Sequence, residues 1–320
     1  MPNGTREIRR RIKSTKNTGK ITKAMEMVAA AKMRKAVASV MATRDYANLA
    51  WTTILHLAEK TDPRHHPLLQ KRNKIERVEL VLISSNRGLC GGYNLRIVQK
   101  AIVSIKKYAQ NVKITEILSL GAKGRDLIRG FGYNVSADFI KTDLTLRSAD
   151  ISAVAHLVMT QYINHEFDKI FVVFTDFIST MKQEPHVKQL LPIEEKEDGT
   201  LGVVGESAGI STTKKFIEGK AGQYLQKGDF SYENIFEPDS DSVLREMLPR
   251  LIEMQIYQAV LESEASEHSA RMMAMRNASE AAEEMIGELT LSFNRARQAG
   301  ITQEISEISS AANALRAKSA

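Results

Sequence analysis

The chain has 320 residues, of which 43% are apolar, so it can bury a sizeable core and wholesale disorder is excluded. No stretch approaches the ~18 apolar residues of a membrane-spanning helix, no apolar secretory signal is present, and the single cysteine, Cys90, excludes an internal disulfide framework, so we expect a protein kept inside the cell. The net charge of +7 is uneven: residues 1–44 hold twelve Lys and Arg against two acids, a local +10, and the rest of the chain therefore carries −3.

The first segment predicts a long helix. From about Thr5 to Glu59 there is no proline and one glycine, Gly19, among mostly good helix formers, which predicts one helix or two joined near Gly19. Steps of four and three residues from Ile8 follow a continuous stripe of mainly small apolar side chains. At ~1.5 Å per residue such a helix is about 80 Å long, more than one compact domain can cover.

The middle of the chain alternates short apolar runs with helical patterns, which is typical of an open α/β domain with a mainly parallel, Rossmann-like sheet over residues 75–193. The predicted strands are Arg77–Ser84, Lys113–Ser119, Val135–Ile140, Lys169–Asp176 and Val187–Leu191. The predicted helices are Asn94–Tyr108, Lys123–Arg129 and Ala149–Asn164. Residues 194–240 are polar and rich in glycine, and we interpret them as a surface insertion and linker that ends at an N-cap, Pro238-Asp-Ser-Asp.

The C-terminal segment, residues 241–320, predicts a second long helix. Twelve of fifteen positions on a 3.5-residue stripe from Met247 to Ala296 are apolar, a coiled-coil signature that requires a partner. Only the first helix, residues 1–60, has a matching length, and the domain between the two lets them return as an antiparallel pair. Ordinary bundle helices are the alternative, although no third long helix completes a bundle. His268 falls on this stripe, where a polar residue more often fixes register than binds a ligand.

A glycine-rich turn, residues 84–94, follows a predicted strand and begins a helix, a place where backbone amides can hold a phosphate. It contains neither phosphate-loop nor dinucleotide spacing, which favours a structural turn. Cys90 could be a nucleophile, but no histidine is near it in sequence. The histidines are scattered rather than spaced as ligands. We therefore predict no catalytic residue, no metal site and no cofactor.

The basic first helix leaves several partners open, because nucleic acid, an anionic membrane surface or an acidic protein would each supply counter-charge. It also resembles an Arg-rich transit peptide, but its apolar stripe runs on without a break, and removal would leave the second helix unpaired. No aromatic residue occurs before Tyr46, which disfavours binding of RNA by stacking.

Separated stretches of the chain resemble one family, the γ subunits of F-type ATP synthases. They are REIRRRIKSTKNTGKITKAMEMVAAAKMRKA at residues 6–36, RGLCGGYN at 87–94, EASEHSARMMAM at 264–275 and NRARQAGITQEISEI at 294–308. Their order and separations match too, so the resemblance covers nearly the whole chain except about residues 194–235.

The resemblance implies a non-catalytic rotor. In this family the terminal helices form a shaft inside a ring of three α and three β subunits, and the α/β domain stands beside ε on the membrane c-ring. The shaft couples proton-driven rotation to ATP synthesis or hydrolysis at the β subunits and regulates their activity. The resemblance also implies a peripheral protein on the cytoplasmic face of the bacterial plasma membrane, with no nucleic acid bound and no direct membrane insertion. A coiled-coil adaptor for nucleic acid is the alternative of a different class, and an enzyme built on the α/β domain ranks third.

Residue by residue, the resemblance assigns subunit contacts. Those facing β are Lys20, Lys23, Met25, Arg87 and Cys90, and polar contacts higher in the shaft are Gln298 and Thr302. The tail Ile305–Ala320 matches a tip held in an apolar sleeve. Asn86 and Gly300 depart from the family, which usually has an acid and an alanine there. The segment 194–235 lacks the cysteine pair of a redox-regulated insertion, so we predict no thiol switch.

Overall fold

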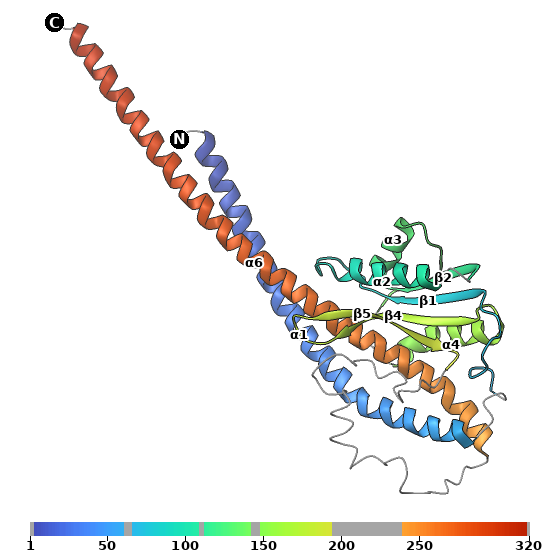
Figure 1. Cartoon of the computed structure of the whole chain (residues 1–320). Coiled ribbons are helices and arrows are strands. Elements are labelled where there is room, and N and C mark those ends of the chain that lie inside the picture. Colours follow the sequence, from blue (N-terminus) through green and yellow to red (C-terminus); the bar gives the residue numbers. More distant parts are fainter. Residues whose placement is uncertain (1–2, 61–65, 109–111, 142–147, 194–238, 319–320) are drawn as a thin grey trace. The chain divides into compact units, whose positions relative to one another are not determined.

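The computed structural model describes residues 3–60, 66–108, 112–141, 148–193 and 239–318 (Figure 1). The chain forms two compact units: a helical unit made of Met1–Val28 with Met272–Ala320, and a sheet unit made of Ala29–Arg271. The domain boundaries that we expect from the sequence follow the ends of helices and strands and differ from the bounds of these two units. The expected domain division therefore stays a prediction. Most of the expected insertion lies outside the described residues.

Two long helices end the chain. α1 covers Asn3–Lys60 without interruption, which resolves the choice left open at Gly19 in favour of one helix. α6 covers Ser240–Lys318 and includes Pro249. Asp239 caps α6 as expected, since its carboxylate accepts hydrogen bonds from the backbone amide and the hydroxyl of Ser242 at 2.7 and 2.8 Å.

Within the helical unit, α1 and α6 lie side by side and run antiparallel. As the residue number increases along α1, the number of its partner in α6 decreases, in four pairs: Arg9 with Phe293, Thr15 with Met285, Gly19 with Ala282 and Thr22 with Ser279. The two hydroxyls of the last pair are 2.8 Å apart. A Cβ placed on Gly19 would already be 3.4 Å from that of Ala282, so small side chains set the close approach. The expected coiled-coil pairing is confirmed, and every position of the α6 stripe from Met247 to Ala296 is buried or half-buried.

Within the sheet unit the same two helices pair again. Ala36 of α1 and Ala265 of α6 are buried in one cluster with Phe177. Further along, the Thr43 hydroxyl donates to the side-chain oxygen of Gln258 at 2.7 Å. The pairing is again antiparallel, and the interface combines small and polar side chains with the larger apolar Met33 and Val37.

The sheet has five strands in the order β3-β2-β1-β4-β5. The strands are β1 Arg77–Ile83, β2 Ile114–Leu120, β3 Val135–Phe139, β4 Lys169–Phe177 and β5 Gln183–Leu191. The first four are parallel and β5 is antiparallel to β4, which confirms the mainly parallel α/β prediction. β5 begins four residues before the expected Val187. Its early part is polar and contains Pro185, which an edge strand tolerates because one side of its backbone needs no sheet partner.

Helices cover both faces of the sheet (Figure 1). α2, Tyr93–Tyr108, and α3, Ala122–Gly130, pack on one face, while α4, Ser148–Ile163, and the Leu248–Val260 part of α6 pack on the other. Apolar side chains of β1 alternate between the two cores, as the period of a strand requires. No helix in the described part of the chain has the length and apolar character needed to cross a bilayer.

Candidate functional site

The glycine-rich turn between β1 and α2 is held by its own polar side chains. The backbone amide of Ser85 donates to the side-chain oxygen of Asn94 at 3.1 Å, and the Ser85 hydroxyl donates to the Arg87 carbonyl at 2.7 Å. Leu89 and Gly91 have φ of 63° and 56°, a left-handed conformation that disfavours most side chains. Leu89 adopts this left-handed conformation although it is not glycine, and the residue is 63% exposed. The turn is therefore rigid at its base and presents Leu89 at its tip.

The amide groups near the turn are already used by the protein. The Gly124 amide donates to the Ser84 hydroxyl at 2.9 Å, and the Lys123 amide donates to the Ser85 carbonyl at 3.0 Å. These are N-terminal amides of α3, and they hold α3 against the turn. In the turn itself the backbone amide of Tyr93, the first residue of α2, donates to the Cys90 carbonyl at 3.3 Å, so the geometry favours the structural interpretation of the turn over nucleotide binding.

Cys90 is buried inside this turn. Its Sγ accepts a hydrogen bond from the side-chain NH2 group of Asn94 at 3.2 Å and lies 3.8 Å from the Ser85 hydroxyl. Burial raises the pKa of the Cys90 thiol, which disfavours the nucleophilic thiolate at neutral pH. The residue packs the turn rather than reacting with a substrate.

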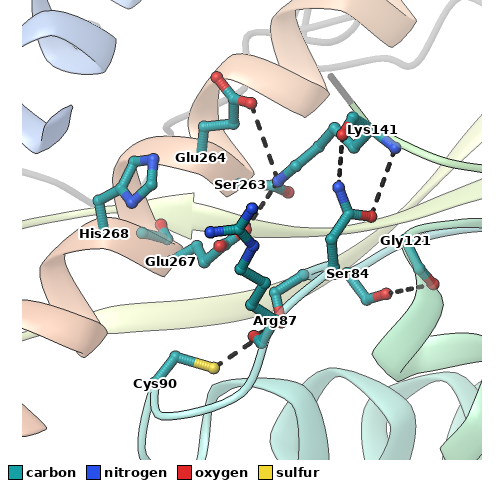
Figure 2. A network of polar contacts seen from close by, with 12 residues as sticks. Ser84, Arg87, Cys90, Gly121, Lys141, Ser263, Glu264, Glu267 and His268 are labelled. Atoms are coloured by element: carbon teal, nitrogen blue, oxygen red, sulfur yellow. Dashed lines mark hydrogen bonds and ion pairs between the residues drawn. The ribbon is translucent and has the colours of Figure 1, made fainter. Parts of the chain in front are cut away.

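Lys141, Glu267 and Arg271 form a charged cluster that joins the turn to α6. Figure 2 shows Lys141 and Glu267 of this cluster. Nζ of Lys141 lies 2.7 Å from Oε2 of Glu267, and the Arg271 guanidinium lies 2.9 Å from Oε1 of the same carboxylate. Arg271 also donates to the carbonyls of Arg87 and Gly88 at 3.2 and 3.3 Å. One α6 carboxylate therefore bridges a cation that binds the turn and a cation from the loop after β3.

The Lys141 backbone completes the cluster, because it exchanges hydrogen bonds with the Asn86 side chain. The side-chain NH2 group of Asn86 donates to the backbone carbonyl of Lys141, and the backbone amide of Lys141 donates to the side-chain oxygen of Asn86 at 3.4 Å. A neutral amide can donate and accept at once, whereas the acid usual in the family accepts only when ionised. Asn86 therefore has a structural partner in this chain.

The charges of the cluster depend on one another. Burial opposes the charge on Lys141, but Glu267 and Glu264 outweigh it and raise the pKa of Lys141. Burial likewise acts to raise the pKa of Glu267, but Lys141 and Arg271 hold it below its usual value. Both groups are therefore ionised at neutral pH. Burial, reinforced by the cations of Lys141 and Arg271, lowers the pKa of His268 to about 4, so this residue of the α6 stripe is neutral at pH 7.

Polar side chains of α6 also bind the backbone at the C-terminal end of β4 directly. The Ser263 hydroxyl accepts from the Thr175 amide at 3.2 Å, and the Ser266 hydroxyl donates to the Thr175 carbonyl at the same distance. The Glu262 carboxylate accepts from the Phe177 amide at 3.3 Å. Directional bonds thus fix which face of α6 meets the sheet in this unit.

The chain matches an ATP synthase family model over residues 4–315. It is 41% identical to the ATP synthase gamma chain of Herpetosiphon aurantiacus over 317 residues, with 97% of this chain and 98% of the relative covered. It is also 41% identical to that of Coxiella burnetii over 312 residues, with the same coverage. It belongs to the ATP synthase gamma chain family.

Solved structures agree in fold. A chain of the Euglena gracilis mitochondrial ATP synthase has a TM-score of 0.63 at 19% identity, covering 99% of this chain and 96% of that one. A central-stalk chain of the Tetrahymena thermophila enzyme has a TM-score of 0.56 at 24% identity, covering 81% and 99%. The family resemblance drawn from the sequence is confirmed, and the alternatives of a nucleic-acid adaptor and an α/β enzyme find no support in these matches.

In this gamma chain the residues expected to contact other subunits fall into three groups. Lys20, Lys23 and Met25 lie on α1, the first two exposed and Met25 half-buried, and Lys23 pairs with Glu26 at 3.0 Å. The other two groups are Arg87 with Cys90 in the glycine turn, and Gln298 with Thr302 on α6. All of these except Met25 and Cys90 are exposed. Because the Cys90 thiol is buried, Cys90 can serve a contact only by shaping the turn.

The sequence reasoning missed the three charged residues that hold the turn. Glu267 and Arg271 are an i,i+4 acid and base next to the α6 stripe, a pattern that predicts only a pair within the helix. Lys141 follows β3 with no motif around it. Nothing in its neighbourhood points to a partner 126 positions away. Among the described residues no cluster of three or more side chains is arranged to hold a metal ion.

Proposed function

We propose that this chain is the central-stalk rotor subunit of an F-type ATP synthase, a subunit that performs no bond chemistry itself. Membership of the gamma chain family, matched over residues 4–315, carries the proposal. Its partners are the ring of three α and three β subunits, ε and the membrane c-ring. It is a peripheral protein on the cytoplasmic face of a bacterial plasma membrane.

The rotor works by binding differently to β subunits in different conformations. Rotation of the c-ring presents each β subunit with a new face of the shaft, and ATP hydrolysis turns the shaft in the opposite direction. An orientation can bias a β subunit only if it contacts the open and closed states unequally. An asymmetric pair of helices meets this requirement, since α1 and α6 present different side chains.

The contacts expected on the shaft are chemically distinct. Lys20 and Lys23 supply positive charge toward an acidic segment of β, with Met25 beside them. Gln298 and Thr302 supply hydrogen-bonding groups further along α6. Beyond Gly300, α6 exposes Ile301, Ile305 and Ile308, which suit an apolar sleeve. These assignments rest on the exposure of the side chains and on the family motif.

A reconstitution experiment tests the proposal. The purified chain alone is expected to hydrolyse no ATP, and its addition to α and β subunits is expected to raise and regulate their hydrolysis. Binding to nucleic acid is measured in parallel at physiological salt, where non-specific affinity is weak. Failure to stimulate α and β, or nucleic-acid binding as tight as binding to the ring, would refute the rotor role.

A further inference from the structure

The turn that carries Arg87 is held on two sides by one charged cluster. On one side Arg271 donates to two successive turn carbonyls, those of Arg87 and Gly88. On the other side the Asn86 amide is bound to the Lys141 backbone. Glu267 joins the two sides, because its two carboxylate oxygens face Lys141 and Arg271 separately.

The cluster is built to keep one geometry. The side chains of Lys141 and Glu267 are 2% and 5% exposed, and that of Arg271 is 13% exposed, so solvent screens them little. A buried ion pair adds little net stability, since desolvation offsets attraction, but removing one partner leaves a charge without compensation. The arrangement therefore contributes more to a unique position of the turn than to the free energy of unfolding.

Arg271 is the member that reaches the turn. Its planar guanidinium carries separate N–H groups, which lets it bind Glu267 and the two carbonyls at once. The same helix is bonded to β4 through Ser263 and Ser266, so the anchor of Arg271 is itself fixed within the sheet unit.

We propose that Arg271, aligned by Glu267 and Lys141, is a positioning residue that fixes the turn carrying Arg87 to α6, so that Arg87 meets β at one defined angle of rotation. The inference rests on the proposed rotor function. It adds that two buried charges, Lys141 and Glu267, and the half-buried Arg271 determine the position from which Arg87 meets β, although none of the three contacts β in this assignment.

The test uses the whole ATP synthase in membrane vesicles and measures ATP hydrolysis and ATP-driven proton pumping together. Arg271→Gln is expected to lower the protons pumped per ATP hydrolysed at least about fivefold, the lower end of typical coupling between sites, while hydrolysis continues. Arg250→Gln is the matched control, because Arg250 is exposed on the same helix and pairs only weakly with Glu253 at 3.8 Å. It should pump as the parent does.

A second set of variants separates positioning from general stability. In an Arg87→Ala background, Arg271→Gln should cause no further loss, because the residue it positions is gone. Arg271→Lys retains the charge beside Glu267 but cannot span both carbonyls, and it should lie between the parent and Arg271→Gln. Since this variant keeps the ion pair, it also serves if Arg271→Gln fails to assemble.

The outcomes are distinct. Additive losses in the double variant, full coupling in Arg271→Lys, or a lowered melting temperature of Arg271→Gln with normal pumping would each overturn the positioning role. Unchanged coupling in Arg87→Ala alongside a loss in Arg271→Gln would overturn it too. If even the parent chain fails to stimulate α and β, the rotor function itself is wrong, which is a different result from any of these.

Discussion

Glu79, a carboxyl group inside the sheet, offers a measurable test of the energetics of the fold. It lies on β1 opposite Glu116 of β2 and is fully buried. Its Oε1 accepts a weak hydrogen bond from the Ser136 hydroxyl at 3.4 Å, and its Oε2 has no hydrogen-bond partner among the described residues. Burial, assisted by Glu116 and Glu166, raises the pKa of Glu79 to about 7.

The direction of the effect follows from where the proton resides. In the unfolded chain the carboxyl loses its proton near its ordinary pKa of 4.5, whereas the folded chain keeps it until about pH 7. Stability from this group is therefore complete below pH 4.5 and is lost as the pH rises to 7. With ~1.4 kcal/mol per pKa unit, the loss between pH 5 and pH 8 is about 2.5 kcal/mol.

Glu79→Gln keeps the size and polarity of the side chain but removes this titration. The variant should be more stable than the parent by roughly 3 kcal/mol at pH 8 and by less than about 1 kcal/mol at pH 5. Urea denaturation of the purified chain, followed by circular dichroism at both pH values, measures the difference. Glu246→Gln is the control, since Glu246 is exposed on α6 and is not one of the charges that shift the pKa of Glu79. Equal pH dependence in the parent and Glu79→Gln would show that the buried carboxyl is already ionised and paired.

Three further substitutions test other parts of the structure. Gly124→Ala would place a Cβ 2.4 Å from the Ser84 hydroxyl oxygen, so it should lower the free energy of unfolding by ~1–3 kcal/mol in urea titrations, whereas the open Gly130→Ala should not. Because the pKa of His268 falls to about 4 on folding, His268 alone should remove roughly 2–3 kcal/mol of stability as the pH drops from 6.5 to 4, measured as the difference in pH dependence between the parent and His268→Gln in urea titrations. Met25→Lys adds a cation to the basic face of α1 and should weaken proton pumping driven by ATP while assembly, measured by co-purification, persists; unchanged pumping would argue against placing Met25 at the β contact.

The long helices and the sheet were predictable because their signals are periodic and local. A stripe that repeats every 3.5 residues predicts a paired helix, and α6 buries or half-buries that stripe from Met247 to Ala296. The runs around β1 and β4 are apolar enough to indicate strands buried on both faces. β5 was partly missed, because its first residues are polar and its place at the sheet edge is a tertiary property.

The polar interior could not be predicted in this way. Glu79 lies in an apolar run, and the run predicts a buried strand without saying that its one acid is buried too. Lys141 and Glu267 form an ion pair between distant segments, and neither segment has a pattern that specifies the other. Pairing of buried charges depends on which elements the fold brings together, and a single sequence does not record that.

The chemistry of the α6 contacts changes along the helix in a way that suits a rotor. Against the sheet, serine hydroxyls and carboxylates make directional bonds to β4 and to the glycine turn, and such bonds resist rotation of the helix about its own axis. In the helical unit the contacts with α1 include the small residues Gly19 and Ala282 and the hydroxyl pair of Thr22 and Ser279, which allow close approach. Beyond Gly300 the helix exposes isoleucines, and apolar contacts have no preferred direction. In the proposed rotor, the first kind of contact suits the part of the shaft where torque enters, and the last suits a tip that turns inside an apolar sleeve.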